Sequence, residues 1–237
     1  MAVRSARAPA CAGACLLVVS LGSCDAPDAP ADAAADPAPS AADVRLSAAT
    51  ACLDVGYLCA SLRDSSSFRI LRWPDRVDRL IVHVPAPPGL EPSIARRLQV
   101  AAARGIAAWD GTPLRIDAAA GAADDADIVV TWVRGLPDSR LGRARVEWAQ
   151  SGTDVRFSVP RFELATHTSG ATPRLQSPGE VELVAVHEMG HALGLPHSDR
   201  DADVMYPSRT ALRLTTRDHR TALALYALPG GALIVRD

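Results

Sequence analysis

The sequence predicts a folded domain that combines β-strands with α-helices, behind an export signal and a flexible tether. Short runs rich in β-branched residues recur between residues 79 and 162. Apolar residues recur at helical spacing in residues 92–110 and again near the C-terminus. A third helical segment, residues 181–193, carries two histidines and a glutamate. With 237 residues, the chain is long enough for one domain with a full hydrophobic core.

Five segments are expected to be β-strands, because they are short, apolar and bounded by turn residues. These segments are residues 79–85, 114–116, 127–133, 143–148 and 154–162. The fourth alternates polar and apolar residues and is the candidate edge strand. Residues 165–178 have the composition of a loop.

Three segments are expected to be helices. Residues 92–110 end before Thr112-Pro113, and residues 181–193 end at Gly194. The last helix, residues 215–226, begins with Thr215 and Asp218 at the spacing of a capping box.

The N-terminus has the pattern of an export signal, residues 1–23. Two arginines precede an apolar stretch that is too short for a comfortable membrane span. It ends in Leu-Gly-Ser before Cys24, which resembles the lipobox of bacterial lipoproteins. The resemblance implies a lipidated Cys24 and a cell-envelope location. The alternative is an ordinary secretory signal.

Residues 24–43 are rich in alanine, proline and aspartate, so they are expected to form an extended tether. An N-terminal segment, residues 44–72, then precedes the main domain, residues 73–237. The net charge of −2 gives no electrostatic reason to expect a nucleic-acid partner. The membrane is expected to be contacted only through the lipid anchor.

Cys52 and Cys59 are expected to form a local disulfide, because an exported protein meets oxidising conditions. Residues seven apart on one continuous helix are too distant for a disulfide. The bridge therefore requires a bend, and Gly56 is a plausible place for it. The alternative is that one cysteine caps the active-site metal.

The histidines of residues 186–197 (VHEMGHALGLPH) have the spacing of zinc ligands. On a helix, His187 and His191 lie one turn apart on one face, where both can bind one ion. Glu188 is offset around the same turn, in the place of a general base for zinc-bound water. Gly194 can end the helix in a left-handed conformation, so that the chain returns and His197 becomes the third ligand.

Residues 187–197 match the metzincin pattern HExxHxxGxxH. Asp203-Val204-Met205-Tyr206-Pro207 resembles the methionine turn of that group. Ser198, together with Met-Tyr-Pro at this distance, is more similar to the matrixins than to the astacins. The resemblance extends over about residues 73–228 and is specific in residues 187–207.

The resemblance implies an α+β, zincin-like domain. Its twisted, mainly parallel sheet has an antiparallel edge strand and packs on two helices, with a third helix at the C-terminus. It implies one catalytic zinc held by His187, His191 and His197, with Glu188 as general base. Met205 supports the site from below, and Tyr206 and Pro207 shape the pocket wall. Substrate is expected to lie along the edge strand, at residues 141–148.

The expected function is hydrolysis of internal peptide bonds in extracytoplasmic proteins or peptides. Two alternatives remain: a catalytically silent, zinc-containing lipoprotein that binds a partner, and a hydrolase of cell-wall peptide amides. The intact Glu188 argues against the first alternative, because a binding module needs no general base.

Several family features have no match in the sequence. These are the cysteine-switch motif, the structural-zinc histidines and the calcium loop. His83, His167 and His219 lie outside any ligand spacing and are expected to be structural or solvated. Four arginines could rim a substrate groove, although a solvated loop is also consistent with their positions: Arg134, Arg140, Arg143 and Arg145.

Overall fold

The computed structural model describes residues 44–52, 56–119, 122–151, 154–208 and 211–237. The predicted signal peptide, Cys24 and the tether of residues 24–43 lie outside the described residues. None of the described helices combines the length and the apolar character needed to cross a membrane.

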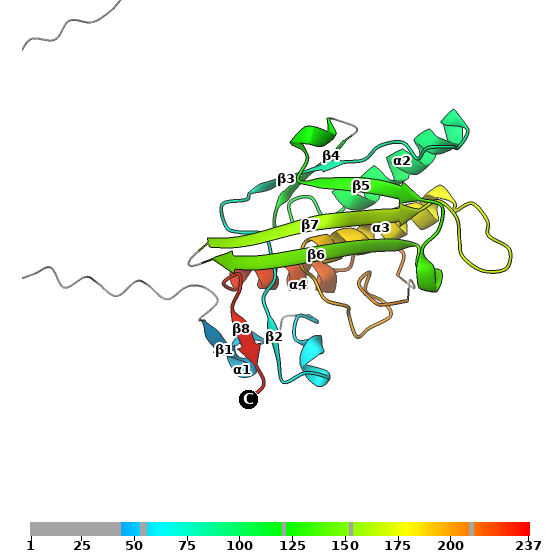
Figure 1. Cartoon of the computed structure of the whole chain (residues 1–237). Coiled ribbons are helices and arrows are strands. Elements are labelled where there is room, and N and C mark those ends of the chain that lie inside the picture. The colour runs from blue at the N-terminus through cyan, green and yellow to red at the C-terminus, as the bar shows by residue number, and fades with distance from the viewer. Residues whose placement is uncertain (1–43, 53–55, 120–121, 152–153, 209–210) are drawn as a thin grey trace, which may run out of the picture. The chain divides into compact units, whose positions relative to one another are not determined.

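A five-stranded sheet forms the frame of the domain (Figure 1). Its strand order is β4-β3-β5-β7-β6, and β6 alone runs antiparallel to its neighbour. The mainly parallel sheet with an antiparallel edge strand, predicted from the resemblance, is therefore confirmed. The strands are β3 (Arg79–His83), β4 (Arg115–Ala119), β5 (Ile128–Val133), β6 (Gly142–Ser151) and β7 (Asp154–Ala165).

Helices α2 (Pro92–Ala107) and α3 (Pro178–Ala192) pack on one face of this sheet (Figure 1). They cross closely at Gly105, where an added Cβ atom would lie 2.3 Å from the carbonyl oxygen of Glu182. The third helix, α4 (Thr216–Ala227), follows the methionine turn. Short helical segments are α1 (Ala48–Ala51) and three 3-10 turns, Ala60–Arg63, Ala123–Asp125 and Pro137–Ser139.

A second, three-stranded sheet was not predicted from the sequence. It consists of β1 (Arg45–Ser47), β8 (Leu233–Val235) and β2 (Ser67–Arg69), with β8 in the middle. β8 runs parallel to β1 and antiparallel to β2. The sheet joins residues 44–72 to the C-terminus, and its Ile234 is fully buried.

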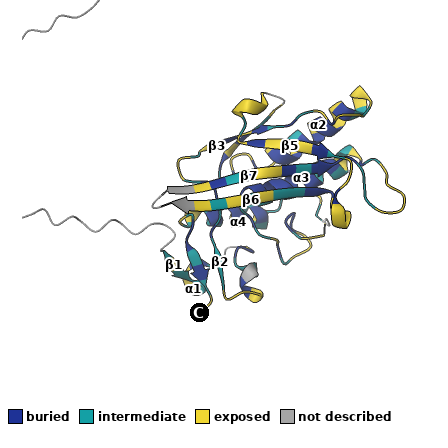
Figure 2. Cartoon of the chain, in the orientation of Figure 1, coloured by how far each residue is buried: buried dark blue, intermediate teal, exposed yellow. Residues whose placement is uncertain are grey.

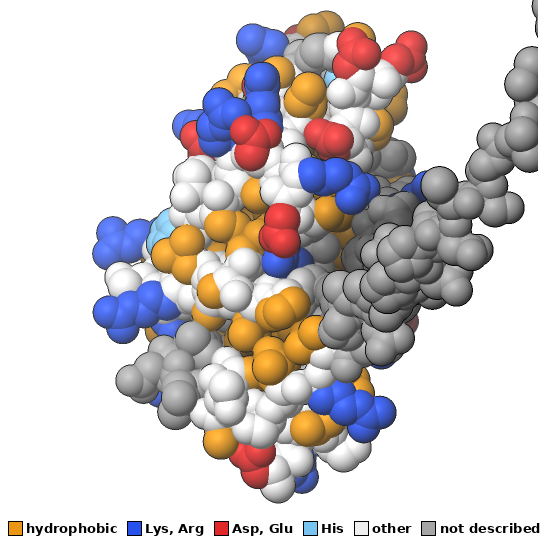
Figure 3. All heavy atoms as spheres, turned by 90° about the vertical axis from the view of Figure 1, so that its left-hand side faces the viewer, with side chains coloured by type: hydrophobic (Ala, Val, Ile, Leu, Met, Phe, Trp, Pro, Cys, Tyr) orange, Lys and Arg blue, Asp and Glu red, His pale blue; other side chains and the backbone are white. Residues whose placement is uncertain are grey.

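The core lies between the large sheet and its helices, and the opposite face of the sheet is open to solvent (Figure 2). β5 shows this directly, since Ile128, Val130 and Trp132 are buried and the residues between them are exposed. On the face drawn in Figure 3, arginine and acidic side chains are interspersed with apolar ones.

Helix α3 begins earlier than predicted, at Pro178 rather than residue 181. Ser177 and Glu180 form a capping box, and Pro178 occupies the first turn, where its missing N–H is not needed. Arg174 donates to both carboxylate oxygens of Glu180, at 2.9 and 2.5 Å. These bonds, followed by the Ser177 N–H, lower the pKa of Glu180 from 4.5 to about 2.

The depressed pKa predicts a pH-dependent effect of Glu180→Gln. The ionised carboxylate contributes stability above the pKa of the unfolded chain, and this contribution is lost as pH falls toward 2. Glu180→Gln should therefore lower the free energy of unfolding at pH 7, and the difference from wild type should shrink from pH 4.5 downward. Urea unfolding across this range measures it. Glu182→Gln, on the same helix, is the control, and an equal difference at every pH would contradict the assignment.

Candidate metal centre and active site

The three predicted ligands converge on one point. The Nε2 atom of His191 lies 3.1 Å from that of His187 and 3.2 Å from that of His197. Two nitrogens that bind one tetrahedral zinc at 2.0–2.1 Å lie roughly 3.3–3.4 Å apart. The observed spacing fits an ion of this size, and the ligand atoms of all three residues lie within 4.8 Å of one another.

The hydrogen bonds of two histidines fix which ring nitrogen faces the centre. Nδ1 of His187 lies 2.8 Å from the carbonyl oxygen of Val204, and Nδ1 of His191 lies 2.9 Å from that of Leu195. A carbonyl oxygen can only accept, so each Nδ1 carries the proton and donates. In the neutral rings both Nε2 atoms then present lone pairs, and the short contact between them is not a hydrogen bond. Lone pairs this close repel unless a cation lies between them.

Desolvation favours the neutral form of two of the ligands. Desolvation, followed by the charges of His187 and His197, lowers the pKa of His191 to about 3. Desolvation, followed by the charge of Arg140, also lowers the pKa of His197. Neutral imidazole is the form that binds a metal, so these rings need not lose a proton at neutral pH.

Gly194 returns the chain to the centre. Its φ of +100° lies in the left-handed region, and an added Cβ atom would lie 1.9 Å from the carbonyl oxygen of Leu71. The helix ends with Leu195 N–H donating to the Gly190 carbonyl at 3.0 Å. The tight turn brings His197 back beside His191, which a straight helix could not do.

Glu188 is held against the edge strand. It is 8% exposed, and its Oε2 atom accepts a 2.7 Å hydrogen bond from the N–H of Ala144 in β6. Gly142 permits this approach, because a Cβ atom there would lie 2.6 Å from Cγ of Glu188. The carboxylate and the three histidines line one cleft of about 560 Å³. Sequence reasoning missed the roles of Gly142 and Ala144, which depend on where β6 crosses α3.

Comparison with known proteins identifies the family. The sequence profile of the matrixin family matches residues 96–227, which is more than half of the chain. The chain belongs to the matrixin family. Macrophage metalloelastase of Rattus norvegicus is 44% identical over 52 residues, which make up 20% of this chain and 11% of the relative. The matched region thus spans only a small part of that relative.

The methionine turn of this matrixin packs beneath the metal centre. Met205 is fully buried. A Cβ atom added to Gly190 would lie only 2.3 Å from the Met205 sulfur, so the glycine makes room for this side chain. Its carbonyl oxygen accepts a 2.8 Å hydrogen bond from the N–H of Ser198, the residue after the third ligand. Pro207 lines the cleft, whereas Tyr206 is not among the lining residues.

Cys52 and Cys59 form a disulfide, with their Cα atoms 5.8 Å apart. Gly56, the expected site of the bend, has a φ of +64°. Because both sulfurs are in this bond, neither cysteine is available to cap the metal. The alternative role weighed for them is therefore wrong for this structure.

The remaining histidines lie outside the metal centre. His219 contacts Thr112 at 3.0 Å and His167 contacts Thr166 at 2.9 Å, whereas His83 lies at the end of β3. Within the described part of the chain, the triad is the one group of three potential ligands close enough to hold a metal ion. Of the four arginines considered, Arg140 and Arg143 line the cleft and the other two do not.

Gly194→Ala tests the turn that returns His197. The methyl group would collide with Leu71, so we expect loss of stability and roughly tenfold weaker zinc binding, as for groups that orient metal ligands. Competition with a chromogenic chelator measures the affinity.

Gly170→Ala is the matched control, because its φ is +118° and nothing lies within 4 Å of the added methyl group. Left-handed strain costs about 1–2 kcal/mol in both variants. Equal zinc affinities in the two proteins would show that the contact at Leu71 does not position His197.

Proposed function

We propose that this matrixin is a zinc-dependent endopeptidase that hydrolyses internal peptide bonds of extracytoplasmic proteins or peptides. The observation that carries the proposal is the shared cleft, in which Glu188 lies beside three converging histidines. Zinc, when bound there by His187, His191 and His197, would polarise the scissile carbonyl and acidify water. A site that only held a metal would not need the buried carboxylate.

Glu188 is the proposed general base. Its Oε2 atom is anchored by the Ala144 N–H, which fixes the carboxylate in the cleft. From this position it would accept a proton from the attacking water and later pass it to the leaving amine.

The free edge of β6 is the proposed substrate platform. Among the described strands, β6 pairs with β7 on one side and with none on the other. In an antiparallel pair, successive residues direct their backbone polar groups alternately toward and away from the partner strand. Leu141 accepts from Ala165 of β7, so Gly142 and Ala144 direct theirs outward, as the bond to Glu188 shows. An extended peptide can pair with this edge as an added strand.

We also propose that the enzyme is an envelope lipoprotein anchored through Cys24, with secretion as the alternative. The lipobox-like sequence and the tether of residues 24–43 support the anchor. The disulfide between Cys52 and Cys59 agrees with an oxidising compartment. Metabolic labelling with a palmitate analogue, lost in Cys24→Ala, tests the anchor.

Cleavage of a mixed peptide library by the zinc-loaded protein tests the proposed reaction. Wild type should cut internal bonds, and Glu188→Ala should retain zinc while losing about 10²–10⁴-fold in rate. Loss of zinc from Glu188→Ala would contradict its role as a base. If zinc-loaded wild type cuts no peptide, a cell-wall peptide amide or a binding role replaces the proposal.

Arg140 predicts a preference for acidic substrates. It lines the cleft and is exposed, and within the described residues its guanidinium forms no ion pair. Arg143, in contrast, pairs with Glu163 at 2.8 Å. A substrate carboxylate could bind it through charge-assisted hydrogen bonds. Arg140→Ala should lower kcat/KM for peptides with Asp or Glu near the cut about tenfold, and added salt should weaken the preference.

Matched peptides with Asn or Gln, and the variant Arg145→Ala, are the controls. Arg145 lies on β6 but does not line the cleft. An equal loss of activity on acidic and neutral peptides would contradict a role of Arg140 in selectivity.

A further inference from the structure

The third ligand differs from the other two in how it is held. His187 and His191 each donate Nδ1–H to a backbone carbonyl, which fixes the orientation of the ring. No such bond from the His197 ring occurs in the part of the chain that the structure describes, and His197 is exposed. Its position must therefore be set by the loop that carries it.

That loop is fixed from below by Arg217 of α4. One nitrogen of the guanidinium donates to Ser198 Oγ at 3.0 Å and also contacts the carboxylate of Asp203. The other donates to Asp199 Oδ1 at 2.6 Å. Ser198 and Asp203 are 4% and 3% exposed, so these contacts lie in a desolvated setting where charged hydrogen bonds are strong. Two residues that directly follow His197 thus share one cation.

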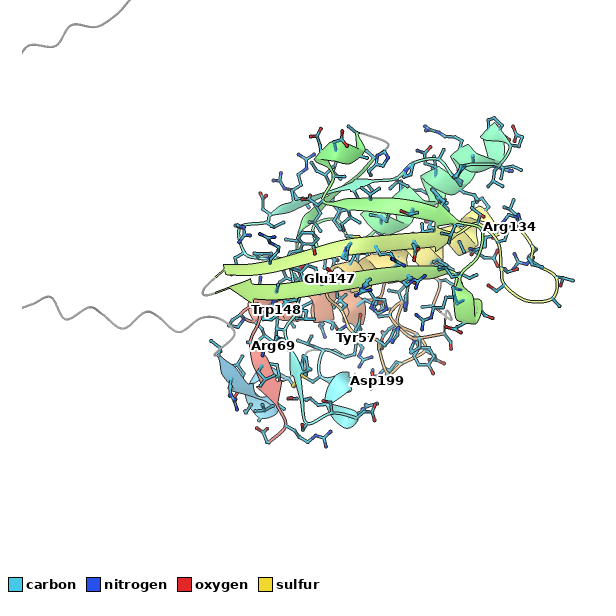
Figure 4. The ribbon with its side chains drawn as sticks, in the orientation of Figure 1. Tyr57, Arg69, Arg134, Glu147, Trp148 and Asp199 are labelled. Atoms are coloured by element: carbon cyan, nitrogen blue, oxygen red, sulfur yellow. A yellow bond between two sulfur atoms is a disulfide. The ribbon has the colours of Figure 1, made fainter. Side chains whose placement is uncertain are left out.

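The same guanidinium reaches the disulfide-closed turn, which is the described segment 56–59 with Cys59 bonded to Cys52. It donates to the carbonyl oxygen of Gly56 at 2.8 Å and lies 5.2 Å above the ring of Tyr57. The Tyr57 hydroxyl donates to Asp218 at 2.9 Å, and Asp218 accepts from Val204 of the methionine turn at 3.1 Å. Tyr57 of this turn and Asp199 of the loop that carries His197 lie on the same side of β6 in Figure 4.

The turn packs too tightly on α4 to shift freely. An added Cβ atom on Gly56 would lie 2.0 Å from Thr221 Oγ1, and the Tyr57 N–H donates to that oxygen at 3.2 Å. Arg63, four residues after Cys59, adds a 2.5 Å contact to the second oxygen of Asp199. The disulfide ties Cys59 to Cys52, and together these contacts hold residues 56–59 against Arg217.

We propose that Arg217 is a positioning residue. Its contacts to the disulfide-closed turn on one side and to Ser198 and Asp199 on the other hold His197 in place, and this sets the zinc affinity of the site. This inference rests on the proposed metal centre and deepens it, because it assigns the N-terminal segment a part in holding the catalytic ion. Arginine suits the role because the N–H groups of its planar guanidinium can contact Asp199, Asp203 and Gly56 together, whereas lysine offers a single point charge.

Zinc affinity of the full chain, measured by chelator competition, tests the role of Arg217. Arg217→Met should raise the zinc dissociation constant about 10-fold or more, within the 10–100-fold range for groups that orient metal ligands. Arg217→Lys should recover part of the loss. Arg220→Met, an exposed arginine on the same helix, should leave the affinity unchanged.

The disulfide is tested with the double variant Cys52→Ser, Cys59→Ser, which should weaken zinc binding in the same direction. Circular dichroism gives the melting temperature of each variant. Zinc affinities are compared only between variants that are folded, at a temperature well below each melting transition. If Arg217→Met does not fold, Arg217→Lys and the cysteine variant decide the question. For peptides that wild type cuts, kcat of these variants at limiting zinc should fall by a larger factor than KM rises, because a smaller fraction of the protein holds zinc.

A purely structural role predicts a different result. Folded Arg217→Lys and the cysteine variant would then melt at lower temperature but bind zinc as tightly as wild type, and that outcome would overturn the proposal. Because zinc affinity needs no substrate, the result is independent of the proposed reaction. A wild-type protein that binds zinc but cuts no peptide would count against the endopeptidase and leave this test intact.

Discussion

The structure of the site depends on three histidine rings whose Nε2 atoms are held close together, in a geometry that a bound cation would stabilise. The Nε2 atoms lie 3.1 and 3.2 Å apart, and two of them are fixed because Nδ1 donates to a carbonyl oxygen. Burial keeps His191 neutral, with a pKa of about 3, so repulsion between protonated rings is avoided. The surrounding packing holds this arrangement, and helix α3 carries two of the three ligands.

Helix α3 is fixed along its length by contacts that leave little room for other side chains. Gly105 of α2 and Gly142 of β6 allow neighbouring elements to approach it within van der Waals distance. At the end of α3, Trp73 Nε1 donates to the Ala192 carbonyl at 2.9 Å. In its middle, Trp109 Nε1 donates to the Val186 carbonyl at 2.8 Å. A helix held in this way cannot rotate to relieve repulsion at the centre. A bound metal ion, rather than movement of the helix, would then relieve the repulsion between the Nε2 lone pairs of His187 and His191.

Much of the large sheet and the ligand set could be predicted from the sequence, because both depend on local patterns. Residues 127–133 and 92–110 carry strong periodicity, and the histidine spacing has a helical meaning. The start of α3 was missed although Ser177 and Glu180 show a capping box, because Pro178 and Gly179 suggest a loop. The small sheet β1-β8-β2 has three residues per strand and joins distant parts of the chain, so no local pattern indicates it.

The boundary of the functional unit follows from the same long-range contacts. The matrixin profile begins at residue 96, yet Leu71 closes against Gly194 and Trp73 binds the last turn of α3. The Gly56 carbonyl oxygen accepts a hydrogen bond from Arg217, which also contacts the loop that carries His197. The residues most specific to the family therefore bind the metal, while residues before the matched region fix the geometry in which they do so. Similarity to the family identifies the chemistry of such a site, and the segments that hold it in place are visible only in the folded chain.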